Sequence, residues 1–471
     1  MRNYQQFYVD GQWVDPLVLE TAEVINPATE DVSGTIALGS PADVDKAVAA
    51  ARRAFTSWSQ TTVAERLDLL RAIQAEYARR QQELGAAVTE EMGAPLSLGT
   101  GFHVGLGAGH LQTAIEVLQD YRFEERRGGT IILKEPIGVC GLITPWNWPL
   151  NQVTVKVFPA IATGCTAVLK PPQLAPYSAQ ILAEILDRAG TPAGVFNMIQ
   201  GKGSVIGTAL SKHADVDMIS FTGSEEVGIQ ITKDAADTVK RVGLELGGKS
   251  AWIILDDADM AANVAAATGG MMINSGQTCS AGSRLLVPAS RMDAALDAAR
   301  VACEGVTVGD PHGAVAMGPV VSKAQYTIVQ SYIEKGIAEG ATLIAGGAGR
   351  PAGLAKGWFC KPTVFAGTNA MTIAQEEIFG PVLVVIGYDN LDHAVAIAND
   401  SRFGLGGYVS GQDAAIAESL ARRIRTGAVW INGGFDFHAP FGGYKHSGNG
   451  REWGAHGFDE YLEIKSIMAP A

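Results

Sequence analysis

The chain has 471 residues, 47% of them hydrophobic, and a formal net charge of −13 at pH 7. This length is too great for one small hydrophobic core, so we expect two or three domains. No run of lysine or arginine offsets the acidic balance, which excludes the basic surface that nucleic-acid binding requires.

Apolar stretches, cysteines and histidines exclude further classes of protein. Residues 1–10 lack the apolar core of a signal peptide, and charges, Gly or Pro interrupt each later apolar stretch, so we expect no membrane segment. The five cysteines are dispersed without a CxxC pair, which is typical of reduced thiols in a cytoplasmic protein. The eight histidines form no HExxH motif and no pair with cysteine, so we expect no metal site.

The first third of the chain is predicted to be mainly helical after a short extended segment at residues 7–14. Ser40 and Pro41 can cap and open a helix that runs to Ala54, because apolar residues recur there at helical spacing. A second amphipathic helix is expected at residues 64–85. The apolar faces of both helices are expected to cover a sheet.

From residue 139 onward, short apolar runs alternate with helical segments. This alternation predicts βαβ units and a parallel, doubly wound sheet, in which the loops after the strands share one edge. The strand candidates are residues 139–145, 166–170, 195–200, 218–222 and 242–246, and the helix candidates are 152–163, 178–189, 204–213 and 224–236.

A second α/β set follows, and we expect it to form a separate catalytic domain. Its strand candidates are residues 250–255, 285–287, 382–386 and 428–431. Residues 121–136 and 461–468 fit neither sheet. Both alternate apolar and polar residues, so each can add strands at a sheet edge or across a subunit interface.

Glycine turns follow two of the strands in the first set. Gly201–Gly203, with Gly207 beyond it, and Thr222–Ser224 each lie between a strand and a helix. Such a turn lets the backbone approach a pyrophosphate, and the following helix N-terminus attracts its charge. Neither turn has the GxGxxG pattern, so a plain structural turn remains the alternative. Gly105–Gly109 has no strand before it and is not read as a nucleotide site.

Two residues between the sheets have the chemistry of acyl transfer. Glu245 ends one predicted strand, and Cys279 lies in a loop at the domain junction. A thiolate nucleophile and a carboxylate base at the carboxyl edge of a cofactor sheet are what acyl chemistry on an aldehyde requires.

Six ordered blocks, together with the spacing of 279 − 245 = 34 residues, resemble the aldehyde dehydrogenase superfamily from end to end. The blocks are Thr144–Pro149, Phe221–Ser224, Glu245–Ser250, Gly276–Cys279, Glu376–Pro381 and Pro440–Lys445, the last with Ser447–Gly448 and Gly450–Glu452. The resemblance implies a Rossmann-like cofactor domain at residues 1–118 and 137–247 and an α/β catalytic domain at 248–446. It also implies a small β oligomerisation element at 119–136 and 457–471, and therefore a homodimer or homotetramer.

The resemblance assigns the catalytic roles. Cys279 is expected to attack the aldehyde and form a thiohemiacetal, and Asn147 to stabilise the oxyanion together with the backbone N–H of Cys279. Lys156 resembles a position that supports this centre, although an exposed helix lysine is the simpler alternative. Glu245 is expected to activate the water that hydrolyses the thioester. Relatives that transfer the acyl group to coenzyme A typically lack this glutamate, so acyl transfer to coenzyme A and a catalytically silent structural protein are the alternatives.

The resemblance also implies NAD or NADP as the cofactor. Lys170 is expected on the adenosine ribose, Glu377 on the nicotinamide ribose and Phe379 against the nicotinamide, although Phe379 can equally be core packing. Gln173 stands where many NAD-preferring members have Glu, which suggests relaxed or dual cofactor use. The cofactor contacts expected overall are Ile143, Thr144, Pro145, Trp146, Lys170, Gln173, Gly203, Gly207, Phe221, Thr222, Gly223, Ser224, Val227, Leu246, Gly247, Glu377 and Phe379.

The resemblance identifies only part of the residues that line the substrate tunnel. Several aromatic residues match or lie near its lining, and no arginine marks a carboxylate site, which suits an apolar or aromatic aldehyde. The expected lining residues are Trp148, Gln152, Thr278, Ser280 and Phe441, with Phe435, Phe437 and His438 nearby. His438 is read as a surface loop residue instead of a catalyst.

Overall fold

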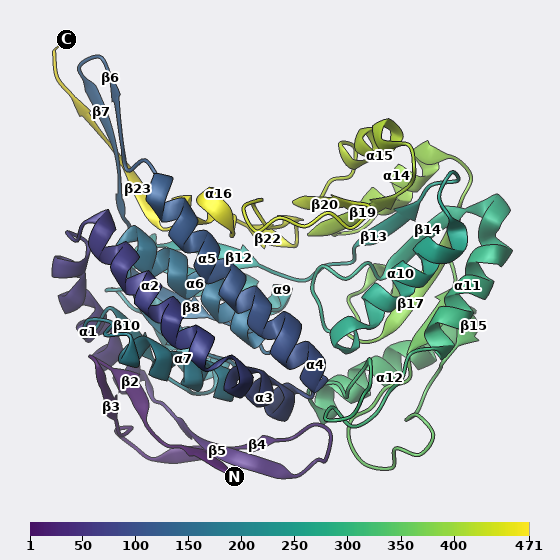
Figure 1. Ribbon diagram of the computed structural model, residues 1–471, viewed down its shortest axis with the longest axis horizontal. Coiled ribbons are helices and arrows are strands. Elements are labelled where there is room, and N and C mark those ends of the chain that lie inside the picture. The colour runs from purple at the N-terminus through teal and green to yellow at the C-terminus, as the bar shows by residue number, and fades with distance from the viewer. Residues whose placement is uncertain (471) are drawn as a thin grey trace.

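The protein, seen in a computed structural model that describes residues 1–470, divides into two α/β lobes and a projecting arm of strands (Figure 1). The first lobe contains most of the N-terminal half, and the second contains the green-coloured residues after β12. The arm carries the C-terminus at its tip. No helix among residues 1–470 combines the length and apolarity needed to cross a bilayer.

The first lobe is built on an eight-stranded sheet in the order β22-β12-β11-β8-β9-β10-β2-β3. The five central strands are parallel, and both edges are antiparallel, which confirms the predicted doubly wound sheet. The strands are β22 (Gly448–Asn449), β12 (Arg241–Glu245), β11 (Met218–Thr222), β8 (Val139–Ile143), β9 (Thr166–Lys170), β10 (Phe196–Met198), β2 (Phe7–Val9) and β3 (Gln12–Val14).

The strand order reverses between β8 and β11. From β8 the chain proceeds to β9 and β10 on one side, and then returns to add β11 and β12 on the other. The loops that leave β8 and β11 therefore diverge at a topological switch point, which is where open α/β sheets bind their ligands. Residues 144–148 and 223–224 form these two loops.

Helices cover both faces of this sheet because its strands are apolar on both sides. Val139 and Ile143 of β8 pack with α1 residues on one face, whereas Cys140 and Leu142 pack with α2, α5 and α6 on the other. The helices are α1 (Pro41–Trp58), η2 (Gly203–Gly207), α8 (Thr208–Lys212) and α9 (Glu225–Ala235) on the first face, and α2 (Val63–Arg79), α3 (Gln81–Met92), α5 (Val104–Asp120), α6 (Pro149–Thr163) and α7 (Tyr177–Arg188) on the second. The short segments α4 (Leu96–Leu98), η1 (Gly99–His103), η3 (Ala236–Thr238) and α16 (Gly454–Asp459) complete the lobe.

The predicted N-terminal helices are present with changed ends. Ser40 begins α1 with a capping box in which its side chain accepts from the N–H of Asp43 and the Asp43 carboxylate accepts from the N–H of Ser40. The single helix expected at residues 64–85 is two, α2 and α3, because Arg80 leaves the helical conformation at φ −108°. Arg80 there pairs with Glu83 and Glu184, and Glu184 belongs to the neighbouring α7.

The second lobe is built on a seven-stranded sheet in the order β15-β16-β17-β14-β13-β19-β20. All of its pairs are parallel except β15 with β16. The strands are β13 (Ala251–Ile254), β14 (Arg284–Pro288), β15 (Thr342–Ala345), β16 (Thr363–Ala366), β17 (Val382–Tyr388), β19 (Gly406–Ser410) and β20 (Ala428–Ile431). The helices are α10 (Met260–Met272), η4 (Ile273–Gly276), η5 (Ala289–Arg291), α11 (Met292–Glu304), α12 (Lys323–Ala338), α13 (Thr372–Gln375), α14 (Leu391–Asn399) and α15 (Ala414–Ala421).

Three smaller sheets surround the lobes. The arm pairs β23 (Leu462–Met468) with β7 (Thr130–Pro136), and β7 with β6 (Glu124–Arg127), so the two segments that fit neither large sheet form one sheet together. β1 (Arg2–Tyr4), β5 (Val32–Leu38) and β4 (Glu20–Ile25) form the second, and β18 (Phe403–Gly404) with β21 (Tyr444–Lys445) the third.

Candidate active site

The switch point of the first sheet presents groups that suit a dinucleotide. Ser224 caps α9, and its Oγ accepts from the backbone N–H of Val227 at 3.4 Å, so this helix N-terminus faces the sheet edge. The hydroxyl oxygens of Thr144 and Thr222 are buried there without a hydrogen-bond partner. Lys170 ends β9 almost fully buried, and this burial lowers the pKa of its ammonium to about 8. Unsatisfied donors beside a helix N-terminus fit an anionic ligand with hydroxyl groups.

Glycines allow the close approaches at this edge. A Cβ on Gly203 would lie 3.9 Å from Nζ of Lys170, and one on Gly207 would lie 3.8 Å from the Ile143 side chain. A Cβ on Gly247 would lie only 2.4 Å from a carboxylate oxygen of Glu377, so any larger residue at 247 would displace that carboxylate.

A hollow of about 450 Å³ separates the two lobes beside Ser224. Glu377 lies in its wall, where the backbone N–H of Gly248 donates to its Oε1 at 2.9 Å and burial raises the pKa of its carboxyl to about 7. Trp146 of the first lobe meets Phe379 of the second edge to face at 5.4 Å between ring centroids. Phe379 has a left-handed backbone with φ +57°, a conformation that bulky residues rarely adopt outside functional loops.

The structure therefore gathers the expected cofactor residues from β8, β9, β11, β12 and the 376–381 loop at one edge. Pro145 and Trp146 lie in the loop after β8, and Phe221–Ser224 continue β11 into α9. Leu246 follows β12, and its backbone N–H donates to the Ser447 carbonyl at 2.9 Å. Gln173 lies three residues beyond the end of β9 and is partly exposed. The side chain of Val227 is exposed, and its backbone N–H donates to Oγ of Ser224.

The loop that carries Cys279 is strained and firmly held. Asn274 and Ser275 adopt left-handed backbones at φ +55° and +56°, followed by Gly276 at φ +71°. Oγ of Ser275 donates to the Gly318 carbonyl at 2.9 Å, and Nδ2 of Asn274 donates to the backbone oxygen of Asn147 at 2.7 Å. These bonds offset the backbone strain and fix the direction in which the loop presents its cysteine.

The loop after β8 reaches across from the first lobe to the same place. Nδ2 of Asn147 donates to the backbone oxygen of Gln277 at 3.1 Å, and Nε1 of Trp148 donates to Oγ1 of Thr278 at 2.9 Å. Asn147 is buried, and its Oδ1 has no partner. The Asn147 amide consequently lies beside the cysteine loop with one N–H still available to a developing oxyanion.

Among the five free cysteines, Cys279 alone is partly exposed, because the other four are buried. Burial of the thiol, followed by the negative charges of Glu377 and Glu245, raises the pKa of Cys279 to about 12. The sulfur is therefore a thiol at neutral pH, and its proton must leave as the sulfur attacks.

Glu245 ends β12 with both carboxylate oxygens buried and unpaired. Burial, and next the charge of Glu452, raise the pKa of Glu245 well above its usual range. The segment after this strand lies close to the cysteine loop, because a Cβ on Gly248 would come within 2.3 Å of the Cys279 carbonyl oxygen. A buried carboxyl with a raised pKa and open lone pairs is suited to take a proton from water.

Lys156 lies fully buried in α6 and is not the exposed lysine of the alternative interpretation. Its ammonium donates to Oγ of Ser220 at 2.9 Å and pairs with Oε1 of Glu452 at 2.5 Å. The charge of Glu452 raises the pKa of Glu245, whereas the charge of Lys156 lowers it.

Aromatic side chains gather around Trp148 and Trp453, where the sequence predicts the substrate tunnel. Trp148 is stacked on His103 at 4.3 Å, and Phe441 is stacked on Trp453 at 4.8 Å. Phe435 and Phe437 complete this cluster around Trp453, and Gln152 is buried in α6. The backbone oxygen of Ser280 accepts from the Tyr408 hydroxyl at 2.9 Å, whereas His438 forms an exposed pair with Glu116 at 2.9 Å.

Three residues of this site escaped the sequence analysis. Glu452 stands in the recognised block Gly450–Glu452, so its position carried a signal that was not assigned a role. Asn274 owes its function to a left-handed backbone, and His103 to its contact with Trp148; neither feature leaves a local pattern in the sequence.

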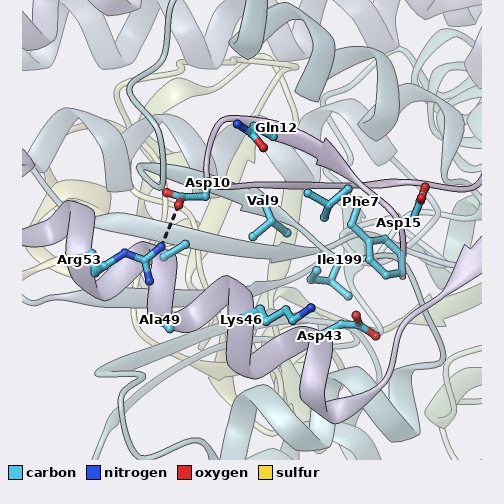
Figure 2. A pocket seen from close by; sticks show the side chains of 12 residues that line it. Phe7, Val9, Asp10, Gln12, Asp15, Asp43, Lys46, Ala49, Arg53 and Ile199 are labelled. Carbon is cyan, nitrogen blue, oxygen red and sulfur yellow. Dashed lines mark hydrogen bonds and ion pairs between the residues drawn. The ribbon is translucent and has the colours of Figure 1, made fainter. Parts of the chain in front are cut away.

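A second hollow, of about 400 Å³, lies away from this chemistry between α1 and the β2–β3 hairpin (Figure 2). Arg53 pairs there with Asp10 at 2.8 Å, and Phe7, Val9 and Ile199 form its apolar wall. It contains no cysteine, and within residues 1–470 no cluster of His, Cys, Asp and Glu could hold a metal ion.

Comparisons with known proteins agree with this geometry. The aldehyde dehydrogenase family model matches residues 13–467. A 3-succinoylsemialdehyde-pyridine dehydrogenase from Pseudomonas sp is 53% identical over 472 residues, which cover 99% of both chains. An aldehyde dehydrogenase C mutant from Pseudomonas syringae, solved with NAD+ and octanal, is 50% identical at a TM-score of 0.98 and covers 99% of this chain and 97% of its own. A betaine aldehyde dehydrogenase from Staphylococcus aureus, solved with NAD+, is 39% identical at a TM-score of 0.94 over 98% of this chain and 94% of its own. The chain therefore belongs to the aldehyde dehydrogenase family, whose fold it shares, and it is an NAD(P)-dependent oxidoreductase acting on aldehydes.

Proposed function

We propose that this enzyme oxidises an aldehyde to the carboxylic acid through a covalent intermediate on Cys279. The observation that carries the proposal is the convergence of three distant segments. Asn147 bonds the backbone of the cysteine loop, Gly248 in the segment after the Glu245 strand approaches the Cys279 carbonyl, and both lie beside the dinucleotide edge of the first sheet.

In the first stage the Cys279 sulfur bonds to the carbonyl carbon. The thiol proton leaves to bulk water during this attack, and Glu245 keeps its carboxylate ionised for the second stage. The carbonyl oxygen becomes an alkoxide that accepts hydrogen bonds from Asn147 Nδ2 and the Cys279 backbone N–H. A neutral amide suits this role because it stabilises the negative charge without giving up a proton.

Lys170, Ser224 and Glu377 would hold NAD(P)+, which when bound would accept the hydride that the alkoxide expels. The thiohemiacetal thereby becomes a thioester on Cys279. Glu245 then takes a proton from a water molecule, whose oxygen attacks the thioester carbon, and the Cys279 thiolate leaves as the carboxylic acid is released.

Two substitutions separate these stages. Cys279→Ala is expected to abolish aldehyde oxidation, because no thiohemiacetal can form. Glu245→Gln is expected to produce a burst of reduced cofactor near one equivalent per site and then to stall before acid release. Rapid-mixing absorbance of the reduced nicotinamide measures both. The buried Cys303 gives the matched control, Cys303→Ala; steady turnover by Glu245→Gln at the control rate would show that another base hydrolyses the thioester.

We further propose that the substrate is a long apolar or aromatic aldehyde. Two observations support this choice. Aromatic side chains cluster around Trp453, and none of the aromatic contacts described above involves a lysine or an arginine. Two similar proteins agree with this choice: the Pseudomonas syringae enzyme was solved with octanal, and the Pseudomonas sp relative is named a 3-succinoylsemialdehyde-pyridine dehydrogenase. A panel of aliphatic, aromatic and charged aldehydes is expected to give the highest kcat/KM for octanal or phenylacetaldehyde, and the highest value for a charged aldehyde would contradict the proposal.

Cofactor use is proposed to be relaxed, because Gln173 offers no carboxylate against a 2′-phosphate. Comparing kcat/KM for NAD and NADP tests this, and a preference for NAD above about a hundredfold, or about 2.7 kcal/mol, would overturn it.

We also propose that the enzyme forms a homodimer or homotetramer through its arm and works in the cytoplasm. The exposed apolar side chains of β23 support the first proposal, and five free cysteines without a disulfide support the second.

A further inference from the structure

Glu225 is the first residue of α9, directly after Ser224, and an arginine and a histidine from other segments hold its carboxylate. Nδ1 of His446 lies 2.6 Å from Oε1 of Glu225, and Nη2 of Arg402 lies 3.4 Å from Oε2. The Glu225 side chain is only 20% exposed, whereas those of its two partners are more than half exposed. The mechanism described above uses none of these three residues.

Both partners of Glu225 come from the small β18–β21 sheet. Arg402 immediately precedes β18, His446 immediately follows β21, and the backbone N–H of His446 donates to the Arg402 carbonyl at 3.1 Å. The next residue, Ser447, donates through its Oγ to the Gly247 carbonyl at 2.7 Å and accepts at that atom from the backbone N–H of Gly404. The small sheet is therefore fixed between the two lobes, and the side chains of Arg402 and His446 reach α9 from outside the cofactor sheet.

The charges around the interlobe hollow explain why this contact affects the cofactor. Four glutamates, at 225, 226, 376 and 377, line the hollow, and Arg402 is the cation among its lining residues. A dinucleotide pyrophosphate at the α9 N-terminus would meet the Glu225 charge at close range, and like charges repel. Arg402 offsets that charge, and the His446 ring shares a hydrogen bond with the same carboxylate. Glu226, one residue further along α9, lines the same hollow, but no ion pair involves it within residues 1–470.

We propose that Glu225, Arg402 and His446 form an interlobe clasp that keeps α9 against the β18–β21 sheet while cofactor is bound, and so slows the release of reduced cofactor. They are positioning residues, since they act through α9. The inference rests on the proposed dinucleotide site at Ser224. Partly exposed ion pairs contribute modestly, so we expect the clasp to change release several-fold without abolishing turnover. Release of product is a step at which such a change becomes visible in kcat.

The test compares two isosteric substitutions on one helical turn. Glu225→Gln and Glu226→Gln each remove one negative charge beside the same hollow, but only the first removes the clasp. The dissociation rate of NADH, followed by fluorescence after rapid mixing with excess NAD+, is expected to be about five times higher in Glu225→Gln than in Glu226→Gln. Equal rates in the two variants would overturn the clasp. If wild-type enzyme failed to bind NADH at all, the proposed function would fail as well.

A double-mutant cycle distinguishes the clasp from two independent effects. Arg402→Gln is expected to speed NADH release by itself but to add little in the Glu225→Gln background, because their ion pair is already lost. Arg402→Lys keeps the charge and is expected to restore most of the wild-type rate. If the double mutant released NADH at a rate raised by the product of the two single-mutant factors, the proposal would be overturned. A purely structural contact would give a different result: the cofactor-free variants would unfold at a lower temperature, but their NADH release would be unchanged. That result would also overturn the proposal.

Discussion

At the scale of single residues, Glu245 has the surroundings that decide how turnover responds to pH. Its carboxyl must be ionised to accept a proton from water, and burial raises its pKa well above the usual range. The sign follows directly: hydrolysis of the thioester is slow below the raised pKa and accelerates as pH rises through it. Single-turnover acid release measured across neutral pH is expected to show this ascending limb, and a pH-independent rate would contradict it.

Glu452 gives a sharper version of the same expectation. Its negative charge is the second cause of the raised pKa of Glu245, and it also pairs with the ammonium of Lys156. Glu452→Gln removes the repulsion and leaves the Lys156 charge to favour the ionised form of Glu245. The ascending limb should therefore move to lower pH.

Glu460 provides the matched control for that variant. Glu460 also raises the pKa of Glu245, but it is the last of the five causes in size. Glu460→Gln is expected to shift the limb in the same direction by a smaller amount. An unmoved limb in Glu452→Gln would show that burial alone sets the pKa of the base.

At the scale of secondary structure, Arg284 ties the first residue of β14 to the end of α14. Its guanidinium is buried and donates to the backbone oxygens of Lys249, Ile397 and Ala398 and to Oδ1 of Asn369. Carbonyls at a helix C-terminus attract a cation, and this one is shielded from water. Arg284→Met would leave these buried acceptors unpaired and is expected to lower the free energy of unfolding by about 3 kcal/mol or more.

Urea unfolding followed by circular dichroism measures that loss. The exposed Arg300, which pairs only within its own helix, supplies the control: Arg300→Met is expected to cost less than about 0.5 kcal/mol. Equal stability of the two variants would contradict the assigned role of Arg284.

Elements with strong local patterns were predictable from sequence. The parallel strands from β8 to β12 alternate with helices at regular spacing, and each expected strand is present within a few residues. The division of one expected helix at Arg80 was not predictable from the local pattern; in the structure Arg80 pairs with Glu184, a residue 104 positions away. The pairing of β7 with β23 was likewise hidden, since each segment alone shows only that it belongs at an edge.

At the scale of the whole molecule, the arm is the feature that implies assembly. The side chains of Ile464 and Met468 are 70% and 79% exposed on β23, a strand with a free edge in this chain. Exposed apolar residues on an unpaired strand favour pairing with another copy. Ile464→Asp is expected to shift the protein toward smaller species in light scattering after size exclusion, with near-normal secondary structure. An unchanged mass would place the interface elsewhere.

The site itself was legible only through resemblance, because its parts are distant in the sequence. Cys279 and Asn147 come from two loops and Glu245 from the end of a strand, in two lobes, and no spacing rule predicts that Asn147 bonds the backbone of Gln277, 130 residues away. Composition and periodicity predicted the two sheets, and the predicted parallel topology placed the loops after the strands at one sheet edge. The contacts of Lys156 with Glu452, and of Glu225 with the β18–β21 sheet, became visible only in three dimensions.

The strand β22 has a consequence for how the chain is made. Leu244 and Glu245 pair with Gly448 and Asn449, so the outermost position of the first sheet is filled by residues that leave the ribosome about two hundred positions later. In a nascent chain arrested before residue 448, one edge of β12 would be unpaired and Glu245 would be exposed to solvent. We therefore expect ribosome-bound intermediates of this protein to remain susceptible to proteases near residue 245 until the final segment emerges.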